Sequence, residues 1–166
     1  LTPIYDGIPD IDIMSKGYFS VVPYVIPGKY TAYAYSYTGG ALLQWCVETI
    51  AKQERDLAKE QNVSVNEYLE AQFAKMRGTN EPTELLVLPH FAGAATPYMD
   101  TGSKGAILGM TTDTTVVDIY RGCMESVVYE MYLNFEMLNE AGLSLKKLHA
   151  TGGGARSKEW MQMKAD

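Results

Sequence analysis

The feature that most constrains the fold is a long amphipathic helix in the second half of the chain. Thr115 and Asp118 have the spacing of a capping box at its start, and Gly142 supplies a stop at its end. Between them, apolar residues recur every three or four positions: Val116, Tyr120, Cys123, Val127, Met131, Phe135 and Leu138. A helix with such an apolar face needs other elements of the chain to pack against it.

Strands are predicted on both sides of this helix. Residues 18–26 are β-branched and aromatic, residues 30–37 alternate small and large side chains, and Pro27-Gly28 between them marks the turn of a hairpin. Short apolar runs predict three further strands, at 84–89, 105–109 and 145–150.

Helices are predicted between these strands. One begins at Thr38-Gly39-Gly40, and a second begins at Ser64, where Glu67 completes a capping box, and ends at Arg77-Gly78-Thr79-Asn80. Ser157 is the predicted N-cap of a final helix. This order predicts an α/β fold, a mixed sheet packed by helices, over residues 17–166, with residues 1–16 as an irregular entry segment or linker.

The composition indicates which partners and which kinds of site the chain is expected to have. The chain has 166 residues and a net charge of −6, with no stripe of Lys and Arg, so nucleic acid is not an expected partner. The start lacks a targeting segment, and no apolar run approaches the ~20 residues that span a bilayer, so we expect no membrane partner. Cys46 and Cys123 lie among apolar residues and suggest reduced thiols in a cytoplasmic protein. His90 and His149 lack ligand-like neighbours, so we expect no protein-held metal site.

The segment with the clearest chemical potential is the turn Thr151-Gly152-Gly153-Gly154-Ala155, with Ser157 after it. Glycines in a turn before a helix let a ligand approach the backbone, and the free N–H groups of the helix start suit phosphate. The turn has neither the P-loop nor the Rossmann spacing. An ordinary tight turn between strand and helix explains the same residues equally well.

The segment Tyr37-Thr38-Gly39-Gly40-Ala41 also opens a helix with glycines. Gly40 would let a flat ring or a ribose lie against the helix, and Gln44, one turn later, would hydrogen-bond it. Alternatively, Gly40 only lets the helix pack closely on the sheet and Gln44 is solvated. A third segment, the loop at 90–104, is unusually apolar; it packs against another lobe or covers the core of its own domain.

Together these segments resemble the C-terminal domain of the FGGY family of carbohydrate kinases. The second signature of the family is similar to Gly105-Ala106-Ile107-Leu108-Gly109 followed by Asp118-Ile119-Tyr120-Arg121-Gly122, although the family usually has Ala or Ser at the last position. The loop with Pro89, Phe91 and Gly93, the Gly40-to-Trp45 helix start and the Thr151-to-Asp166 segment resemble further family motifs in the same order.

The resemblance implies a lobe of the ribonuclease-H-like fold of actin, hexokinase and Hsp70, with ATP bound in the cleft between two lobes. It places Gly40, Gln44, Gly152, Gly153 and Ser157 near the nucleotide, and Gly154 at a more variable position of the motif. Ser157 stands where glycerol kinases often have Asn.

The implied activity is ATP-dependent phosphorylation of a hydroxyl on a sugar or polyol, with Mg²⁺ carried by ATP. The Gly-Asp-Gln/Asn-like motif that holds the catalytic Asp of the family does not occur in the chain, so we expect no catalytic residue here. We expect the chain to be truncated at both ends, to transfer no phosphate alone and to self-associate through uncovered apolar surface. The alternatives are a non-catalytic nucleotide-binding module of the actin-like fold and an interaction domain with purely structural glycine turns.

Overall fold

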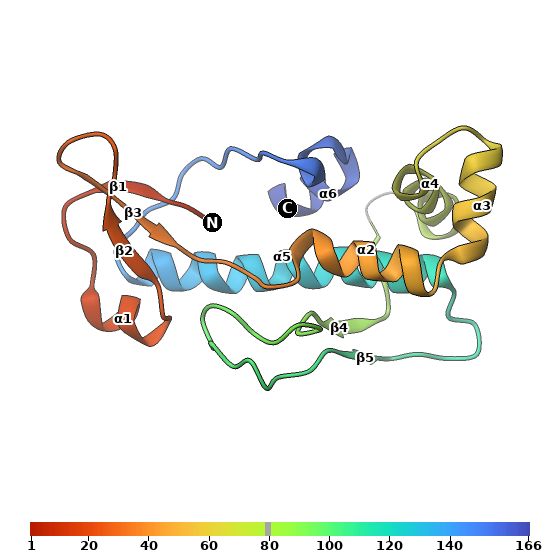
Figure 1. The fold of residues 1–166 in the computed structure, drawn as a ribbon, viewed down its shortest axis with the longest axis horizontal. Helices are drawn as coiled ribbons and strands as arrows, with labels where there is room; N and C mark the ends of the chain where they lie inside the picture. The colour runs from red at the N-terminus through yellow and green to blue at the C-terminus, as the bar shows by residue number, and fades with distance from the viewer. Residues whose placement is uncertain (79–80) are drawn as a thin grey trace.

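A computed structural model describes residues 1–78 and 81–166, and the long helix α5 (Val116–Glu140) runs through its middle (Figure 1). Its capping box forms as predicted, because Thr115 accepts a hydrogen bond from the Asp118 N–H and Asp118 accepts one from the Thr115 N–H. Residues 120–126 of α5 are all buried, so this part of the helix is covered on every side. The helix therefore organises the layers of the domain.

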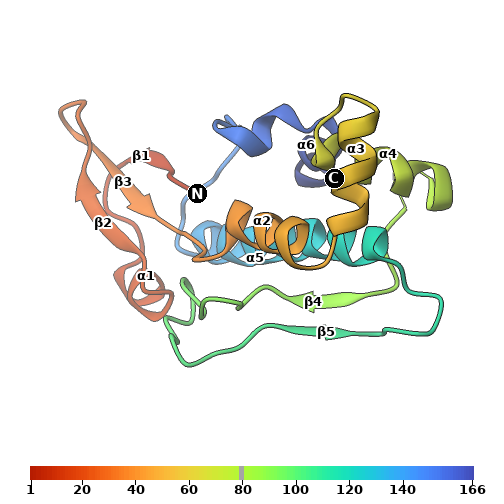
Figure 2. The same cartoon turned by 45° about the vertical axis from the view of Figure 1, so that its right-hand side comes forward.

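Three helices pack against α5 on one side: α2 (Gly39–Thr49), α4 (Val65–Arg77) and α6 (Lys158–Ala165). The antiparallel pair β4 (Leu86–Leu88) and β5 (Ala106–Leu108) lies along the opposite side, and both views show this order of layers (Figures 1 and 2). The main core lies between these layers and includes Leu42, Cys46, Leu69, Phe73, Val87, Tyr120, Cys123, Met124 and Trp160.

Gly122 lies where α5 meets the β4 layer. A Cβ atom at this position would lie 2.9 Å from Cγ2 of Val87, closer than real Cβ contacts come. The lack of a side chain therefore lets the helix approach the strand. This packing gives a structural reason for glycine at this position of the chain.

A second sheet lies at the other end of α5. It contains β1 (Ile4–Asp6), β3 (Lys29–Tyr33) and β2 (Ser20–Pro23) in that order, all antiparallel, with α1 (Ile11–Lys16) beside it. A separate apolar core joins this sheet and α1 to the last turns of α5, and it includes Met14, Phe19, Ala32, Ala34, Leu138 and Leu143.

The structure confirms the mixed α/β class but differs from the expectation in four places. Residues 1–16 contain a paired strand and a helix capped by Asp10 rather than an irregular linker. Residues 145–150 form no strand, and most of them are exposed. The strands form two small antiparallel sheets instead of one mixed sheet. Helix α3 (Lys52–Glu60) was not expected. Apart from Leu57, all of its residues are polar, charged or Ala, so the sequence shows no apolar run there.

The remaining boundaries agree with the sequence. The hairpin around Pro27-Gly28 pairs β2 with β3, and Ser64 with Glu67 caps α4. Helix α4 ends at Arg77 with Gly78 as its C-cap, and the last part of its predicted end, Thr79-Asn80, lies outside the described residues. No helix in the described part of the chain is both long and apolar enough to cross a membrane.

Candidate functional site

The glycine turn before α6 begins at Gly152, which has φ of 87°. Only glycine adopts this backbone region without strain, so the residue is required by the path of the chain. The next residues, Gly153–Arg156, form one short 3₁₀ turn (η1) that leads into Ser157 and α6. A Cβ atom added at Gly152 or Gly153 would meet nothing within 4 Å. The outer side of the turn is therefore open to a ligand.

Gly154 differs from its two neighbours. A Cβ atom here would lie 2.6 Å from the ring of Trp160, so the absence of a side chain lets the indole pack beneath the turn. Trp160 is buried, and its Nε1–H donates to the carbonyl oxygen of Met124 on α5 at 3.1 Å. Gly154 thus has a packing role that accounts for it, and its predicted contact with a nucleotide stays a prediction.

Ser157 connects the turn to α4. Its hydroxyl oxygen accepts a hydrogen bond from the Trp160 N–H at 2.9 Å, which caps α6 as predicted. The same hydroxyl donates to Oε2 of Glu70 at 3.0 Å. Burial raises the pKa of Glu70, while the hydrogen bond from Ser157 and the charge of Arg121 act to lower that pKa.

Glu70 was not identified from the sequence. It lies in the middle of α4 among residues that read as an ordinary amphipathic helix, and 87 positions separate it from Ser157. Only the packing of α4 beside α6 brings the two side chains together.

The start of α2 offers a second open surface. A Cβ atom at Gly40 would meet nothing within 4 Å, so packing inside the domain does not require glycine there. The observation argues against the alternative in which Gly40 is glycine only to let the helix pack closely on the sheet. Gln44 is exposed one turn later, and its side-chain amide donates to Glu48. Gly40, Gln44 and Glu48 form the exposed stripe of α2, opposite its buried residues.

The helices that follow the two glycine segments pack into the same apolar core. Among the described residues, no hydrogen bond joins one glycine segment to the other. Leu42 and Cys46 of α2 belong to the same apolar cluster as Trp160 of α6. Both helices pack on α5, and the two views show the turn before α6 on the side of α5 where α2 lies (Figures 1 and 2). The sequence-predicted residues therefore form two groups on a common support.

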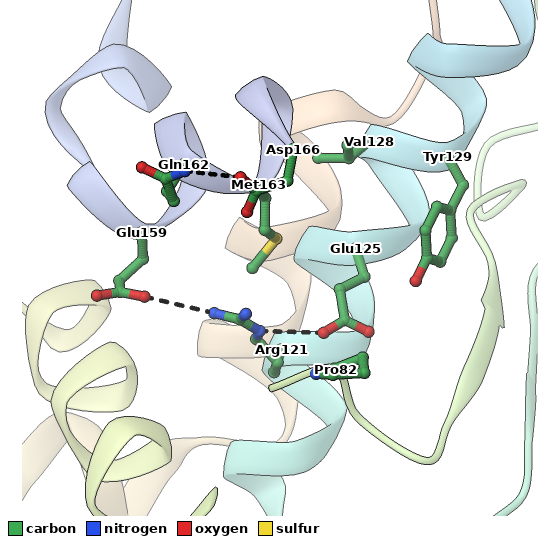
Figure 3. Close-up of a pocket in the computed structure, with 9 residues that line it drawn as sticks. All are labelled: Pro82, Arg121, Glu125, Val128, Tyr129, Glu159, Gln162, Met163 and Asp166. Atoms are coloured by element: carbon green, nitrogen blue, oxygen red, sulfur yellow. Dashed lines mark hydrogen bonds and ion pairs between the residues drawn. The ribbon is translucent and has the colours of Figure 1, made fainter. Parts of the chain in front are cut away.

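A separate pocket of about 210 Å³ lies between α5, α6 and Pro82 (Figure 3). Three of its charged side chains form ion pairs: Arg121 Nε lies 3.0 Å from Glu125 Oε1, and Arg121 Nη1 lies 3.6 Å from Glu159 Oε2. Glu125 also accepts a hydrogen bond from the Thr83 N–H. This network ties α5 to α6 and to the segment before β4, and none of the predicted site residues lines the pocket.

The apolar loop at 90–104 covers the core of its own domain, which is one of the two alternatives for it, and its packing against another lobe stays a prediction. Ala94, Ala95 and Thr96 are fully buried and cover the domain itself, whereas Tyr98 and Met99 are exposed. His90 is buried beneath the loop, with Nδ1 2.8 Å from the hydroxyl of Ser103 and Nε2 3.6 Å from Glu130. No group of three or more His, Cys, Asp or Glu side chains placed to hold a metal occurs among the described residues.

Comparisons with known proteins agree with this architecture. The chain is 28% identical over 141 residues to a xylulose kinase from Staphylococcus epidermidis, covering 85% of the chain and 26% of that protein. It is 31% identical over 159 residues to a glycerol kinase from Aquifex aeolicus, covering 93% of the chain and 29% of that protein. A crystal structure described as a xyloylose kinase from Brucella ovis superposes with a TM-score of 0.78 at 18% identity, over 99% of the chain and 30% of that structure.

The chain thus spans less than a third of the length of these relatives. The model of the C-terminal domain of the FGGY family of carbohydrate kinases matches residues 8–166. The match covers nearly the whole chain, and it includes both glycine segments. The chain belongs to the FGGY family of carbohydrate kinases, as a C-terminal domain of that family.

Proposed function

We propose that this chain is the nucleotide-binding lobe of an ATP-dependent kinase that phosphorylates a hydroxyl group of a sugar or polyol. The observation that carries the proposal is the open space at Gly40 and Gly153. Neither glycine lies where a Cβ atom would collide, so packing within the domain does not account for them. Close approach of a ligand to the backbone accounts for both.

The two glycine segments suit different parts of a nucleotide. The turn at Gly152 and Gly153 leads to the start of α6, where unpaired N–H groups and the helix dipole favour phosphate oxygens. The exposed stripe of α2 offers a flat surface at Gly40 and a side-chain amide at Gln44 for the ribose or the base. We assign Gly40, Gln44, Gly152, Gly153 and Ser157 to the nucleotide, with Gly154 supporting the turn.

Mg²⁺ belongs to the proposal as a companion of ATP. It offsets the charge of the phosphates during phosphoryl transfer. The catalytic base is proposed to be an Asp outside this chain, so that the chain supplies nucleotide binding alone.

The substrate is proposed to be a small carbohydrate, with a ketopentose or a deoxysugar preferred to glycerol. The relatives found by sequence include both a xylulose kinase and a glycerol kinase, so the family supports the broad class more than one member of it. A cytoplasmic location is part of the same proposal, in keeping with two free, buried cysteines.

The test is Gly153→Val in the protein at its natural length. A branched side chain in the open space should raise the KM for ATP at least tenfold and leave the KM for the sugar within about twofold, because only ligand approach is blocked. Gly102→Val, in an exposed loop, is the matched control and should change neither constant. An unchanged KM for ATP in Gly153→Val would show that the turn is structural, as the interaction-domain alternative requires.

A further inference from the structure

The hydroxyl of Ser157 has little capacity left for a ligand. A serine hydroxyl has one donor hydrogen and two acceptor positions. Its hydrogen goes to Glu70, and one acceptor position is filled by the Trp160 N–H. A ligand that needs an acceptor at this corner of the turn must therefore find it mainly on another side chain.

Glu70 is the side chain that can provide that acceptor. A carboxylate offers about four acceptor positions, and the Ser157 hydroxyl takes one of them. The bond to Ser157 also fixes the carboxylate, because Ser157 is itself held by the start of α6. Glu70 is only partly buried, so it stands at the edge of the site rather than inside the core.

The charge of Glu70 determines which part of a nucleotide it can meet. Glu67 and Glu159 lie near it and add negative potential, and Arg121 offsets only part of it. Phosphates are repelled by such a group and are better placed at the open glycines of the turn. The uncharged end of the nucleotide, which carries N–H donors, suits the carboxylate.

We propose that Glu70 is a specificity-determining residue that accepts a hydrogen bond from the exocyclic 6-amino group of adenine. This inference rests on the proposed function of the chain and deepens it by naming what selects the base. Ser157 then belongs to the proposed nucleotide site as a positioning residue, since its hydroxyl holds the Glu70 carboxylate toward the ligand. Guanine is disfavoured because it carries an oxygen acceptor where adenine carries the amino group.

The experiment compares ATP with purine riboside 5′-triphosphate, which lacks only the 6-amino group, as phosphate donors for the protein at its natural length. A hydrogen bond to a charged acceptor predicts that the unaltered protein prefers ATP about tenfold in kcat/KM. Glu70→Ala should reduce this preference to about onefold, while Glu70→Gln, which keeps an acceptor oxygen, should retain a preference of a few-fold. Glu60→Ala removes an exposed carboxylate at the end of α3 and should keep the full preference.

The preference, not the absolute rate, is the decisive readout. A structural role for Glu70 would weaken both triphosphates equally and leave their ratio unchanged, and this result would overturn the inference while the proposed function stands. If Glu70→Ala does not fold, Glu70→Asp replaces it, because it withdraws the carboxylate by one methylene. This variant should lower the preference for ATP over purine riboside triphosphate, and a full preference would overturn the inference.

A 2′-deoxyATP arm separates the base from the ribose. If Glu70→Ala abolished discrimination against 2′-deoxyATP but kept discrimination against purine riboside triphosphate, Glu70 would bind the ribose and the assignment to adenine would be wrong. If neither ATP nor its analogue supported phosphorylation or bound to the protein, the proposed function would fail together with this inference.

Discussion

The two ends of α5 use the same helix in different ways. At one end, α2, α4 and α6 pack around residues 117–124, and the open glycines, with the partly buried Ser157 and Glu70, lie at the outer side of these helices and of the turn before α6. At the other end, the three-stranded sheet and α1 close a purely apolar core on Leu138. The comparison teaches that the helical end leaves open space beside its core, where we propose that the nucleotide binds, whereas the sheet end packs an apolar core without any of the proposed site residues.

The largest expected effect comes from removing a core residue at each end. Trp160→Ala should lower the free energy of unfolding by about 3–5 kcal/mol and Leu138→Ala by about 2–5 kcal/mol, because both side chains are buried. Thermal or urea unfolding measures this loss. Below the melting temperature, only Trp160→Ala should also raise the KM for ATP, since it removes the support beneath Gly154. A similar rise in Leu138→Ala would break the distinction between the two ends.

The contact between α5 and β4 should tolerate little added volume. Gly122→Leu places a large side chain against Val87 and should cost about 1–3 kcal/mol of unfolding free energy through overpacking. Gly122→Ala places only a methyl group 2.9 Å from Val87 Cγ2 and gains helix propensity, so it should cost less than the leucine variant. Equal stability of the leucine and alanine variants would show that the close approach of α5 to β4 is not a constraint.

The two serine caps provide a matched pair with a smaller effect. Ser64→Ala and Ser157→Ala should each lower the free energy of unfolding by about 1 kcal/mol, because each removes a side-chain acceptor from a helix start. Only Ser157→Ala should raise the KM for ATP, by a few-fold, since it also releases Glu70. Nucleotide kinetics on both variants, at equal folded fractions, decide whether the α6 cap has a role beyond the helix.

The smallest effect concerns pH. Burial raises the pKa of Glu70, so between the unfolded pKa near 4.5 and the higher folded pKa the folded state binds more protons than the unfolded state. Stability contributed by this group is therefore present at lower pH and lost as the pH rises through its folded pKa. Relative to the unaltered protein, Glu70→Gln should gain stability as the pH increases across this window. A constant difference between the two unfolding curves from pH 4 to pH 8 would contradict this expectation.

Local chemistry was readable from the sequence wherever the signal lies within a few residues. The capping boxes at Ser64 and Thr115 and the long apolar repeat of α5 predicted their helices correctly. The N-cap at Ser157 likewise marked the start of α6. Predictions from local sequence were wrong where pairing between distant segments decides the structure. Residues 1–16, predicted to be irregular, contain a strand because β1 pairs with β3. Residues 145–150, predicted to be a strand, lack a partner strand among the described residues.

The sequence by itself determined the family, the α/β class and the glycine segments that are candidates for the nucleotide. Only the tertiary structure distinguished the three glycines of the turn, because backbone angle, open space and contact with Trp160 depend on the surrounding atoms. It also brought Glu70 to Ser157 across 87 positions. Side-chain spacing in sequence reports neighbours along one helix or strand, whereas contacts between helices depend on how all of them pack against α5.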